Sequence, residues 1–149
     1  MSPDFLDIIR ALSNADARFI IVGAYAVNIY VDPRATGDLD IWVEPSESNA
    51  VKVLRALEDF GAPLTEVSES DFAKPGVTFQ IGIAPLRIDI LTEISGVRFD
   101  EAWNDRSMHA FGPFKIPFLG KHTLIQNKRA SGRPKDLADL NALTEEQSS

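Results

Sequence analysis

The sequence predicts an α+β fold in which a small mixed β-sheet is flanked by helices. Its 149 residues are 44% hydrophobic, so the chain can bury one core and is too short to divide comfortably into two. Short β-branched runs alternate with segments whose apolar residues recur at helical spacing, which indicates both strands and helices. We therefore expect residues 1–149 to form a single domain, with a core at about residues 18–120 and a C-terminal helical segment at about residues 121–143.

A helix, a strand and a second helix are expected first. Apolar residues at positions 5, 8, 9 and 12 have helical spacing, which predicts an amphipathic helix over residues 4–13. The run of β-branched residues at 18–22 predicts a buried strand. Gly23 follows that strand and predicts a sharp turn into a short helix over residues 24–30, which makes the turn a candidate phosphate site.

An alternating strand and the clearest helix of the chain come next. Residues 38–43 read Asp-Leu-Asp-Ile-Trp-Val, which predicts a strand with both carboxylates and the indole on one face. Residues 45–60 carry an apolar stripe at helical spacing, and Gly61 marks the end of that helix. Residues 77–83 and 86–91 then predict two further strands.

The last third of the chain is expected to be mostly helical. Residues 116–119 predict an edge strand, because Pro117 within it cannot donate a ladder hydrogen bond. Helices are expected over residues 121–130 and 134–143, the second with proline in its first turn. Residues 145–149 are expected to be frayed.

Composition limits the classes of function. No apolar run approaches the roughly 20 residues that a membrane span needs, so no membrane partner is expected. The start of the chain lacks the pattern of a secretory signal, from which we expect a cytoplasmic protein. The sequence has no cysteine, which excludes disulfides and thiolate metal sites and leaves oxygen atoms as the expected metal ligands.

The charge is distributed unevenly along the chain. A net charge of -7 argues against a protein that coats nucleic acid non-specifically, because such binding depends on cations that face phosphates. The segment from Lys115 to Lys135, however, contains six basic residues and no acidic one. This segment predicts a positive face, and the alternative is a basic helix that is simply solvated.

Three aspartates form the strongest candidate site. Asp38 and Asp40 share one face of a strand, and Asp89 lies in the middle of a later strand. Carboxylates that converge in a half-buried sheet raise one another's pKa values, and a divalent cation such as Mg²⁺ relieves that conflict. The alternative is that Asp38 caps a turn while the other two aspartates are solvent-exposed. Trp42, on the same face, could line the cleft or pack in the core.

The order of these elements resembles the nucleotidyltransferase superfamily typified by DNA polymerase beta. The residues that carry the resemblance are Gly23-Ala24, the segment Thr-Gly-Asp-Leu-Asp-Ile at 36–41 and the segment Arg-Ile-Asp-Ile at 87–90. Within the superfamily the chain looks most like bacterial nucleotidyltransferases of the AbiEii type. That narrower resemblance rests on residues 34–40, Lys128 and residues 133–140.

The resemblance implies transfer of a nucleoside monophosphate from a nucleoside triphosphate to an acceptor hydroxyl. Two Mg²⁺ ions would bridge the carboxylates and the triphosphate, and the hydroxyl would attack the α-phosphorus while pyrophosphate leaves. The metal ligands implied are Asp38, Asp40 and Asp89. The catalytic residues implied are these three and Lys128, and the nucleotide-binding residues are Gly23, Ala24, Arg34, Thr36, Arg133 and Asp136.

Several of these residues also have simpler interpretations. Lys128 could be an exposed helix lysine, Arg34 a loop cation, and Asp136 a partner for the dipole of the last helix, with Asp139 a further candidate on that helix. The chain also departs from the family at Ala24, where the family usually has serine or glycine, so a hydroxyl contact to the triphosphate is missing. Backbone N–H donors remain at that turn.

The acceptor is left open by the sequence. RNA such as a tRNA, or a protein, is one class of acceptor, and the resemblance to AbiEii-type enzymes suggests a toxin–antitoxin system. One alternative is a catalytically weak binding or antitoxin module. Another is nucleotidylation of a small molecule such as an antibiotic, for which the short chain would need a homodimer or a protein partner to enclose the substrate.

Overall fold

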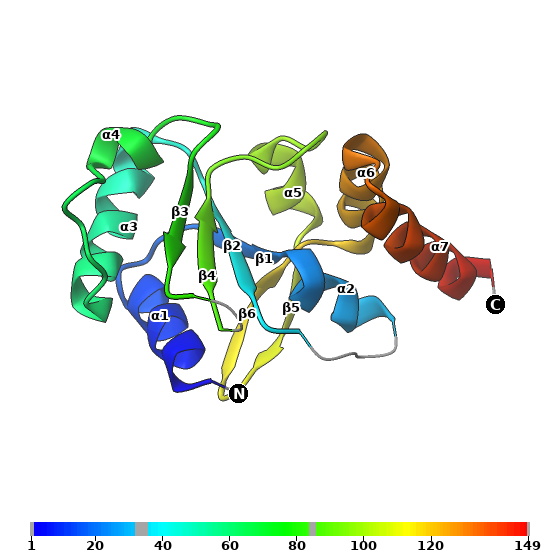
Figure 1. Cartoon of the computed structure of the whole chain (residues 1–149), viewed down its shortest axis with the longest axis horizontal. Coiled ribbons are helices and arrows are strands. Elements are labelled where there is room, and N and C mark those ends of the chain that lie inside the picture. Colours follow the sequence, from blue (N-terminus) through cyan, green and yellow to red (C-terminus); the bar gives the residue numbers. More distant parts are fainter. Residues whose placement is uncertain (1, 32–35, 84–85, 149) are drawn as a thin grey trace.

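The computed structural model describes residues 2–31, 36–83 and 86–148, in which a mixed sheet of six strands has helices on both sides (Figure 1). The strands are β1 (Phe19–Val22), β2 (Leu39–Val43), β3 (Thr78–Ile81), β4 (Ile88–Leu91), β5 (Ser107–Phe111) and β6 (Phe114–Phe118). The helices are α1 (Pro3–Asn14), α2 (Gly23–Tyr30), α3 (Glu47–Phe60), α4 (Glu69–Phe72), α5 (Phe99–Asp105), α6 (Lys121–Ser131) and α7 (Pro134–Ser148). This is the α+β architecture that the sequence predicts.

The strand order, β3-β4-β2-β1-β6-β5, brings the predicted carboxylate strands together. Strand β2 pairs with β1 in antiparallel and with β4 in parallel orientation. In this register Asp40 lies opposite Val22 on one neighbour and opposite Asp89 on the other. Two strands that are distant in sequence therefore place their aspartates side by side, next to the end of β1.

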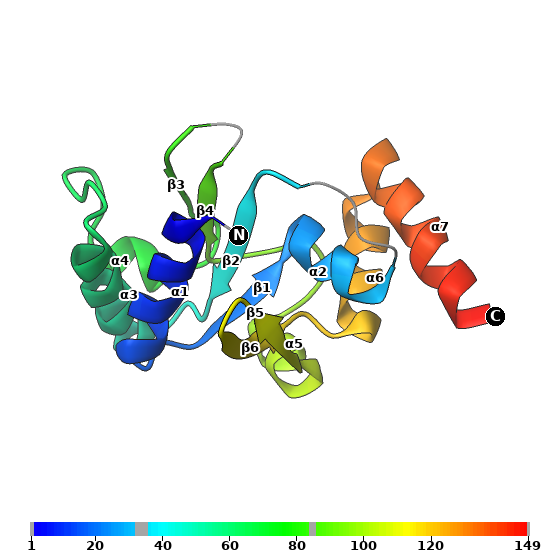
Figure 2. The ribbon, with the colours of Figure 1, turned by 90° about the horizontal axis from the view of Figure 1, so that it is seen from below.

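Helices cover the sheet in two groups. Figures 1 and 2 show α1, α3 and α4 together on one side of the strands, and α2, α6 and α7 on the other. The apolar stripe of α1 is buried, with Ile8, Ile9 and Leu12 fully inaccessible. Leu124 of α6 and Leu143 of α7 belong to the same buried cluster as the strands, so the C-terminal helices share the core.

Helix α3 is capped at both ends, and its first turn is also hydrogen-bonded to residues that flank the sheet. The Ser46 hydroxyl accepts a hydrogen bond from the Asn49 N–H at 3.2 Å, and Gly61 ends the helix in the left-handed conformation that its sequence position predicts. Asn49 is 3% exposed, and its side chain accepts from the N–H of Arg18 and donates to the carbonyls of Arg18 and Glu44. These bonds attach α3 to the residue before β1 and to the residue after β2.

The structure differs from the sequence prediction in the second half of the chain. Strand β6 is internal, and the sheet ends instead at β5, whose alternating Ser-Met-His-Ala-Phe gave too weak a strand pattern to be recognised. Helices α4 and α5 were also missed, although Glu101 of α5 accepts a hydrogen bond from the N–H of Arg98 as a capping-box residue does. The tail expected to fray is helical to Ser148.

Across the described ranges, the helices lack the length and apolar character that a bilayer crossing requires.

Candidate active site

The site begins at the turn between β1 and α2. Gly23 has a φ of 69° and opens α2, where no described side chain caps the free backbone N–H groups of the first turn. A Cβ atom at Gly23 would collide with Oδ2 of Asp40, so glycine is required both for the backbone conformation and for the approach of the carboxylate. The Asp40 carboxylate thus packs directly against the start of a helix, where backbone donors and the helix dipole favour anions.

The three predicted carboxylates gather at this point. Asp89 is 7% exposed, whereas the side chain of Asp38 is 39% exposed. The pKa of Asp40 is raised to about 6, mainly by burial and also by the charges of Asp89 and Asp38 and a hydrogen bond with Asp89, while the charge of Lys135 lowers it. The Asp40 carboxylate is therefore more readily protonated than an ordinary aspartate, as expected for a half-buried carboxylate close to other negative charges.

One cation already pairs with two of these carboxylates. Nε of Arg87 donates to Oδ1 of Asp89 at 3.0 Å, and its Nη2 lies 3.3 Å both from Oδ2 of Asp89 and from Oδ2 of Asp38. Sequence reasoning gave Arg87 no role of its own, although it directly precedes the strand that carries Asp89.

The donor set suits a hard divalent cation, because it consists of carboxylate oxygens only. Asp38, Asp40 and Asp89 would hold such an ion. Within the described ranges, no group of three His, Cys, Asp or Glu side chains is arranged as a metal site. In this structure the Arg87 guanidinium forms ion pairs with two of the three carboxylates, Asp38 and Asp89.

A cleft of about 390 Å³ opens beside the carboxylates. It is lined by predicted residues of the Gly23 turn, of β2 and of the segment before β2, together with cations from α6, α7 and the connection between these helices. The lining residues are Gly23, Ala24, Thr36, Gly37, Asp38, Asp40, Lys128, Arg133 and Lys135. Arg34, also predicted for this site, lies outside the described residues. Lys135 was counted only in the basic segment, and its place in the cleft depends on how α7 packs, which no local pattern encodes.

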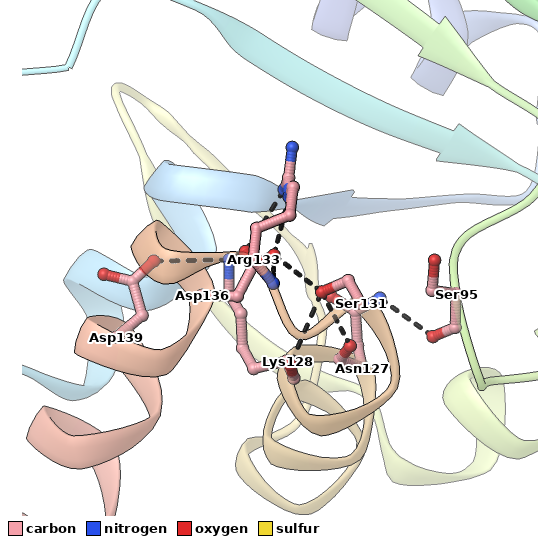
Figure 3. Close-up of polar contacts among 7 residues, drawn as sticks. All are labelled: Ser95, Asn127, Lys128, Ser131, Arg133, Asp136 and Asp139. Atoms are coloured by element: carbon pink, nitrogen blue, oxygen red, sulfur yellow. Dashed lines mark hydrogen bonds and ion pairs between the residues drawn. The ribbon is translucent and has the colours of Figure 1, made fainter.

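Lys128 lies between α6 and α7 in a buried polar cluster (Figure 3). The side chain is 5% exposed, and Nζ lies 3.2 Å from Oδ1 of Asp136 and 3.3 Å from Oδ2 of Asp139. Lys128 is therefore not the exposed helix lysine of the simpler interpretation. Its charge joins the two helices as well as lining the cleft.

Asp136 organises the same cluster. It is fully buried and accepts hydrogen bonds from Ser131 at 2.8 Å and from Nε and Nη2 of Arg133 at 2.6 and 3.1 Å. The hydrogen bonds from Arg133, and further ones from Ser131 and Lys128, hold the pKa of Asp136 well below its usual range. Asp136 is thus more than a partner for a helix dipole, because it fixes the orientation of Arg133, whose side chain is 67% exposed at the cleft.

A second hollow, of about 450 Å³, is also lined by Asp40. It shares Gly23, Lys128 and Arg133 with the first cleft, and Ser95 of the loop after β4 lines it as well. Helix α6 holds this loop in place: Asn127 donates to the carbonyl of Ser95 at 2.9 Å, as Figure 3 shows, and Gln126 donates to the carbonyl of Gly96 at 2.7 Å. Asp40 therefore lines two hollows.

The same loop separates this hollow from a larger cleft of about 820 Å³. Trp42 lines the larger cleft, yet it is 2% exposed and packs edge-on against Phe99, so it belongs to the core as well. Its Nε1 has no hydrogen-bond partner among the described residues. The carboxylates of Glu44, Glu93 and Asp100 also line this cleft.

Comparison with known proteins identifies the fold. No family model matches the chain, and no curated protein sequence does. Among solved structures, TM1012 of Thermotoga maritima, which is assigned as a nucleotidyltransferase, aligns over 98% of this chain and 96% of its own with a TM-score of 0.60 and 15% identity. The lincosamide antibiotic adenylyltransferase LnuA, solved with lincomycin bound, aligns over 97% of this chain and 96% of its own, with a TM-score of 0.57 and 17% identity. The chain therefore has the nucleotidyltransferase fold.

Proposed function

We propose that this protein is a metal-dependent nucleotidyltransferase that moves a nucleoside monophosphate from a nucleoside triphosphate to an acceptor hydroxyl. The observation that carries the proposal is the cleft in which a glycine turn at a helix start, clustered carboxylates and a wall of cations meet. The likeness in fold to nucleotidyltransferases along almost the whole chain supports it.

Each part of the cleft has a chemical role in this proposal. The free N–H groups at the start of α2, together with Arg133 and Lys135, would bind the phosphates. Asp38, Asp40 and Asp89 would hold Mg²⁺, which supplies charge neutralisation at the attacking and leaving oxygens. Asp89 would orient the acceptor hydroxyl or take its proton. Because backbone donors do the work at the turn, Ala24 is compatible with phosphate binding.

RNA is the acceptor that the charge distribution favours. Arg129, Arg133 and Lys135 are exposed on α6 and α7, although the protein as a whole is acidic. A polyanion would therefore be attracted to this end of the molecule and repelled elsewhere. The resemblance to AbiEii-type enzymes also favours RNA and a place in a toxin–antitoxin system.

A small molecule is the second candidate acceptor. The 820 Å³ cleft lies beside the hollow that reaches Asp40, has aromatic walls at Trp42 and Phe99, and is lined by three carboxylates against the single cation Arg98. Such a cleft suits an amine-bearing compound. LnuA, whose fold is similar, is an antibiotic adenylyltransferase.

The test is a transfer assay with each of the four nucleoside triphosphates, radiolabelled at the α-phosphate. The protein is incubated with Mg²⁺ and, in separate reactions, with total cellular RNA, total protein, or an amine-bearing antibiotic such as lincomycin. The variant Asp38→Ala/Asp40→Ala is compared with Glu58→Ala/Asp59→Ala, which removes two exposed carboxylates from α3. The control variant should transfer label as the native protein does, and the site variant should not.

The acceptor that becomes labelled identifies the substrate class. Label on RNA supports the first candidate and label on the antibiotic supports the second. Equal transfer by the native protein and by Asp38→Ala/Asp40→Ala would refute the proposal. Absence of transfer together with Mg²⁺-dependent nucleotide binding by both variants would refute it as well, since the carboxylates would then have no part in binding.

A further inference from the structure

Arg87 holds a central position among the carboxylates. It precedes β4 by one residue, and its guanidinium forms a two-point contact with Asp89, at 3.0 and 3.3 Å, and a third contact with Asp38, at 3.3 Å. The side chain is 33% exposed, so these ion pairs are partly shielded from water. Two of the three carboxylates that the proposed function assigns to metal thus share one internal cation.

A guanidinium and a divalent metal make competing demands on the same oxygens. The paired contact uses both oxygens of Asp89, and a further oxygen is taken from Asp38. A metal ion held by these carboxylates would lie within a few ångströms of a fixed positive charge unless the arginine withdrew. Two cations that close repel strongly where solvent is partly excluded.

The third carboxylate is excluded from this arrangement. Among the described residues no ion pair joins Asp40 to Arg87, and Asp40 lies instead against Gly23 and opposite Asp89 in the strand register. Arg87 therefore neutralises Asp38 and Asp89 and leaves Asp40 without a direct counter-ion from this side chain. Three carboxylates and one guanidinium leave the site with a net negative charge, which favours the binding of a divalent cation.

We propose that Arg87 is a built-in counter-ion, which holds Asp38 and Asp89 in the metal-free protein and must release them before a divalent metal can bind. This inference rests on the proposed function for the role of the carboxylates. Arg87 is a positioning residue in this scheme. It holds Asp38 and Asp89 close together when no metal is bound, and it weakens metal binding in the absence of nucleotide.

The test measures Mn²⁺ binding to the full chain without nucleotide, by calorimetry or by the electron paramagnetic resonance signal of free Mn²⁺. Arg87→Gln should bind Mn²⁺ about five- to tenfold more tightly than the native protein, because a nearby positive charge has been removed. Arg87→Lys keeps the charge but loses the two-point contact, so its affinity should lie between the two. Arg10→Gln, which removes an exposed arginine paired with Asp7 on α1, should bind as the native protein does.

A second measurement separates competition from general damage to the fold. In the presence of a chelator, Arg87→Gln should melt at a lower temperature than the native protein, because the carboxylates then repel without a counter-ion. Saturating Mg²⁺ should raise its melting temperature more than that of the native protein. An equal or smaller rise would overturn the inference.

The outcomes distinguish this inference from the proposed function. Mn²⁺ binding that Asp38→Ala/Asp40→Ala abolishes but Arg87→Gln leaves unchanged or weakens would overturn the role of Arg87 and leave the proposed function standing. Tighter binding by Arg87→Gln without any nucleotidyl transfer by the native protein would support the counter-ion and count against the enzyme. Lack of Mn²⁺ binding by the native protein and by both Arg87 variants would overturn the inference.

Discussion

At the residue scale, Gly23 has no Cβ atom, and the Asp40 carboxylate occupies the space that a Cβ atom would need. Gly23→Ala should destabilise the protein by about 1–2 kcal/mol through its positive φ alone, and more through the collision with Asp40. The displaced carboxylate should also abolish Mg²⁺-dependent binding of nucleoside triphosphate. Denaturant unfolding and a nucleotide-binding titration measure the two effects.

Gly61 supplies the matched control for Gly23. Its φ is 90°, and a Cβ there would meet nothing within 4 Å. Gly61→Ala should therefore show the backbone strain without any change in nucleotide affinity. If Gly23→Ala bound nucleotide as well as Gly61→Ala does, the close approach of Asp40 to the turn would have no functional meaning.

Asp40 should make the protein less stable at neutral pH than at acid pH. Its pKa in the folded protein is about 6, against an ordinary value of 3.8, so the folded state binds the proton more tightly than the unfolded state. The contribution of this group to stability therefore falls as pH rises from about 4 to about 6 and is constant above.

Asp40→Asn should remove that penalty. Without metal, the variant should be more stable than the native protein by about 2–3 kcal/mol at pH 7.5 and nearly equal to it at pH 4. Denaturant unfolding at the two pH values, with a chelator present, provides the comparison. The control Asp59→Asn, at an exposed position of α3, should leave the stability unchanged at both pH values. If Asp40→Asn were less stable than the native protein at pH 7.5, the ionised Asp40 carboxylate would not carry the free-energy penalty that its raised pKa implies.

At the scale of elements, the contact between α6 and α7 depends on a buried charge. Asp136→Asn would leave Lys128 with Asp139 as its remaining ion-pair partner in the cluster and should destabilise the protein by about 3 kcal/mol. Lys128→Met should cost less in this variant than in the native protein, because Lys128 has already lost one of its two carboxylate partners. Unfolding of the single and double variants measures the coupling, and strictly additive losses would show that the pair acts independently.

Local patterns explain which elements could be predicted from the sequence. Helices α1 and α3 and strands β1, β2 and β4 carry clear periodicity with caps or glycine stops, so their places were predicted to within about two residues. Strand β5 and helix α5 were missed because they span only 5 and 7 residues and show no clear apolar periodicity, and β6 was misplaced at the sheet edge because β5 was missing from the prediction. Edge position is a property of the whole sheet, which no single segment encodes.

The same reasoning explains the candidate site. Asp38, Asp40, Asp89 and Gly23 could be predicted as candidates because each follows from a strand pattern or a turn residue, and the resemblance to nucleotidyltransferases implied their common role. Arg87 and Lys135 could not, because their roles depend on distances between elements that are far apart in sequence. Arg87 lies in the strand expected over residues 86–91 and Lys135 in the helix expected over residues 134–143, but neither pattern reveals the electrostatic partner of the side chain.

At the scale of the whole molecule, the cations that line the cleft keep their positions only while α6 and α7 stay packed against the rest of the protein. Leu124, Ile125 and Leu143 are buried in the same apolar cluster as the strands, so these helices have no core of their own. We therefore expect the described part of the chain to unfold in one cooperative transition. A fold held together in this way keeps Arg133 and Lys135 facing the carboxylates until global unfolding.

Two spectroscopic probes that report on different elements test this expectation. Trp42 of β2 and Trp103 of α5 both pack against Phe99, whereas α7 lies beyond α6 at the end of the molecule and contributes to far-ultraviolet circular dichroism (Figure 1). Denaturation curves from tryptophan fluorescence and from circular dichroism should coincide. If ellipticity were lost at a lower denaturant concentration than fluorescence, α7 would unfold as a separate unit, and the cations of the cleft would be present only part of the time. Nucleotide affinity would then be lost at the lower of the two transitions.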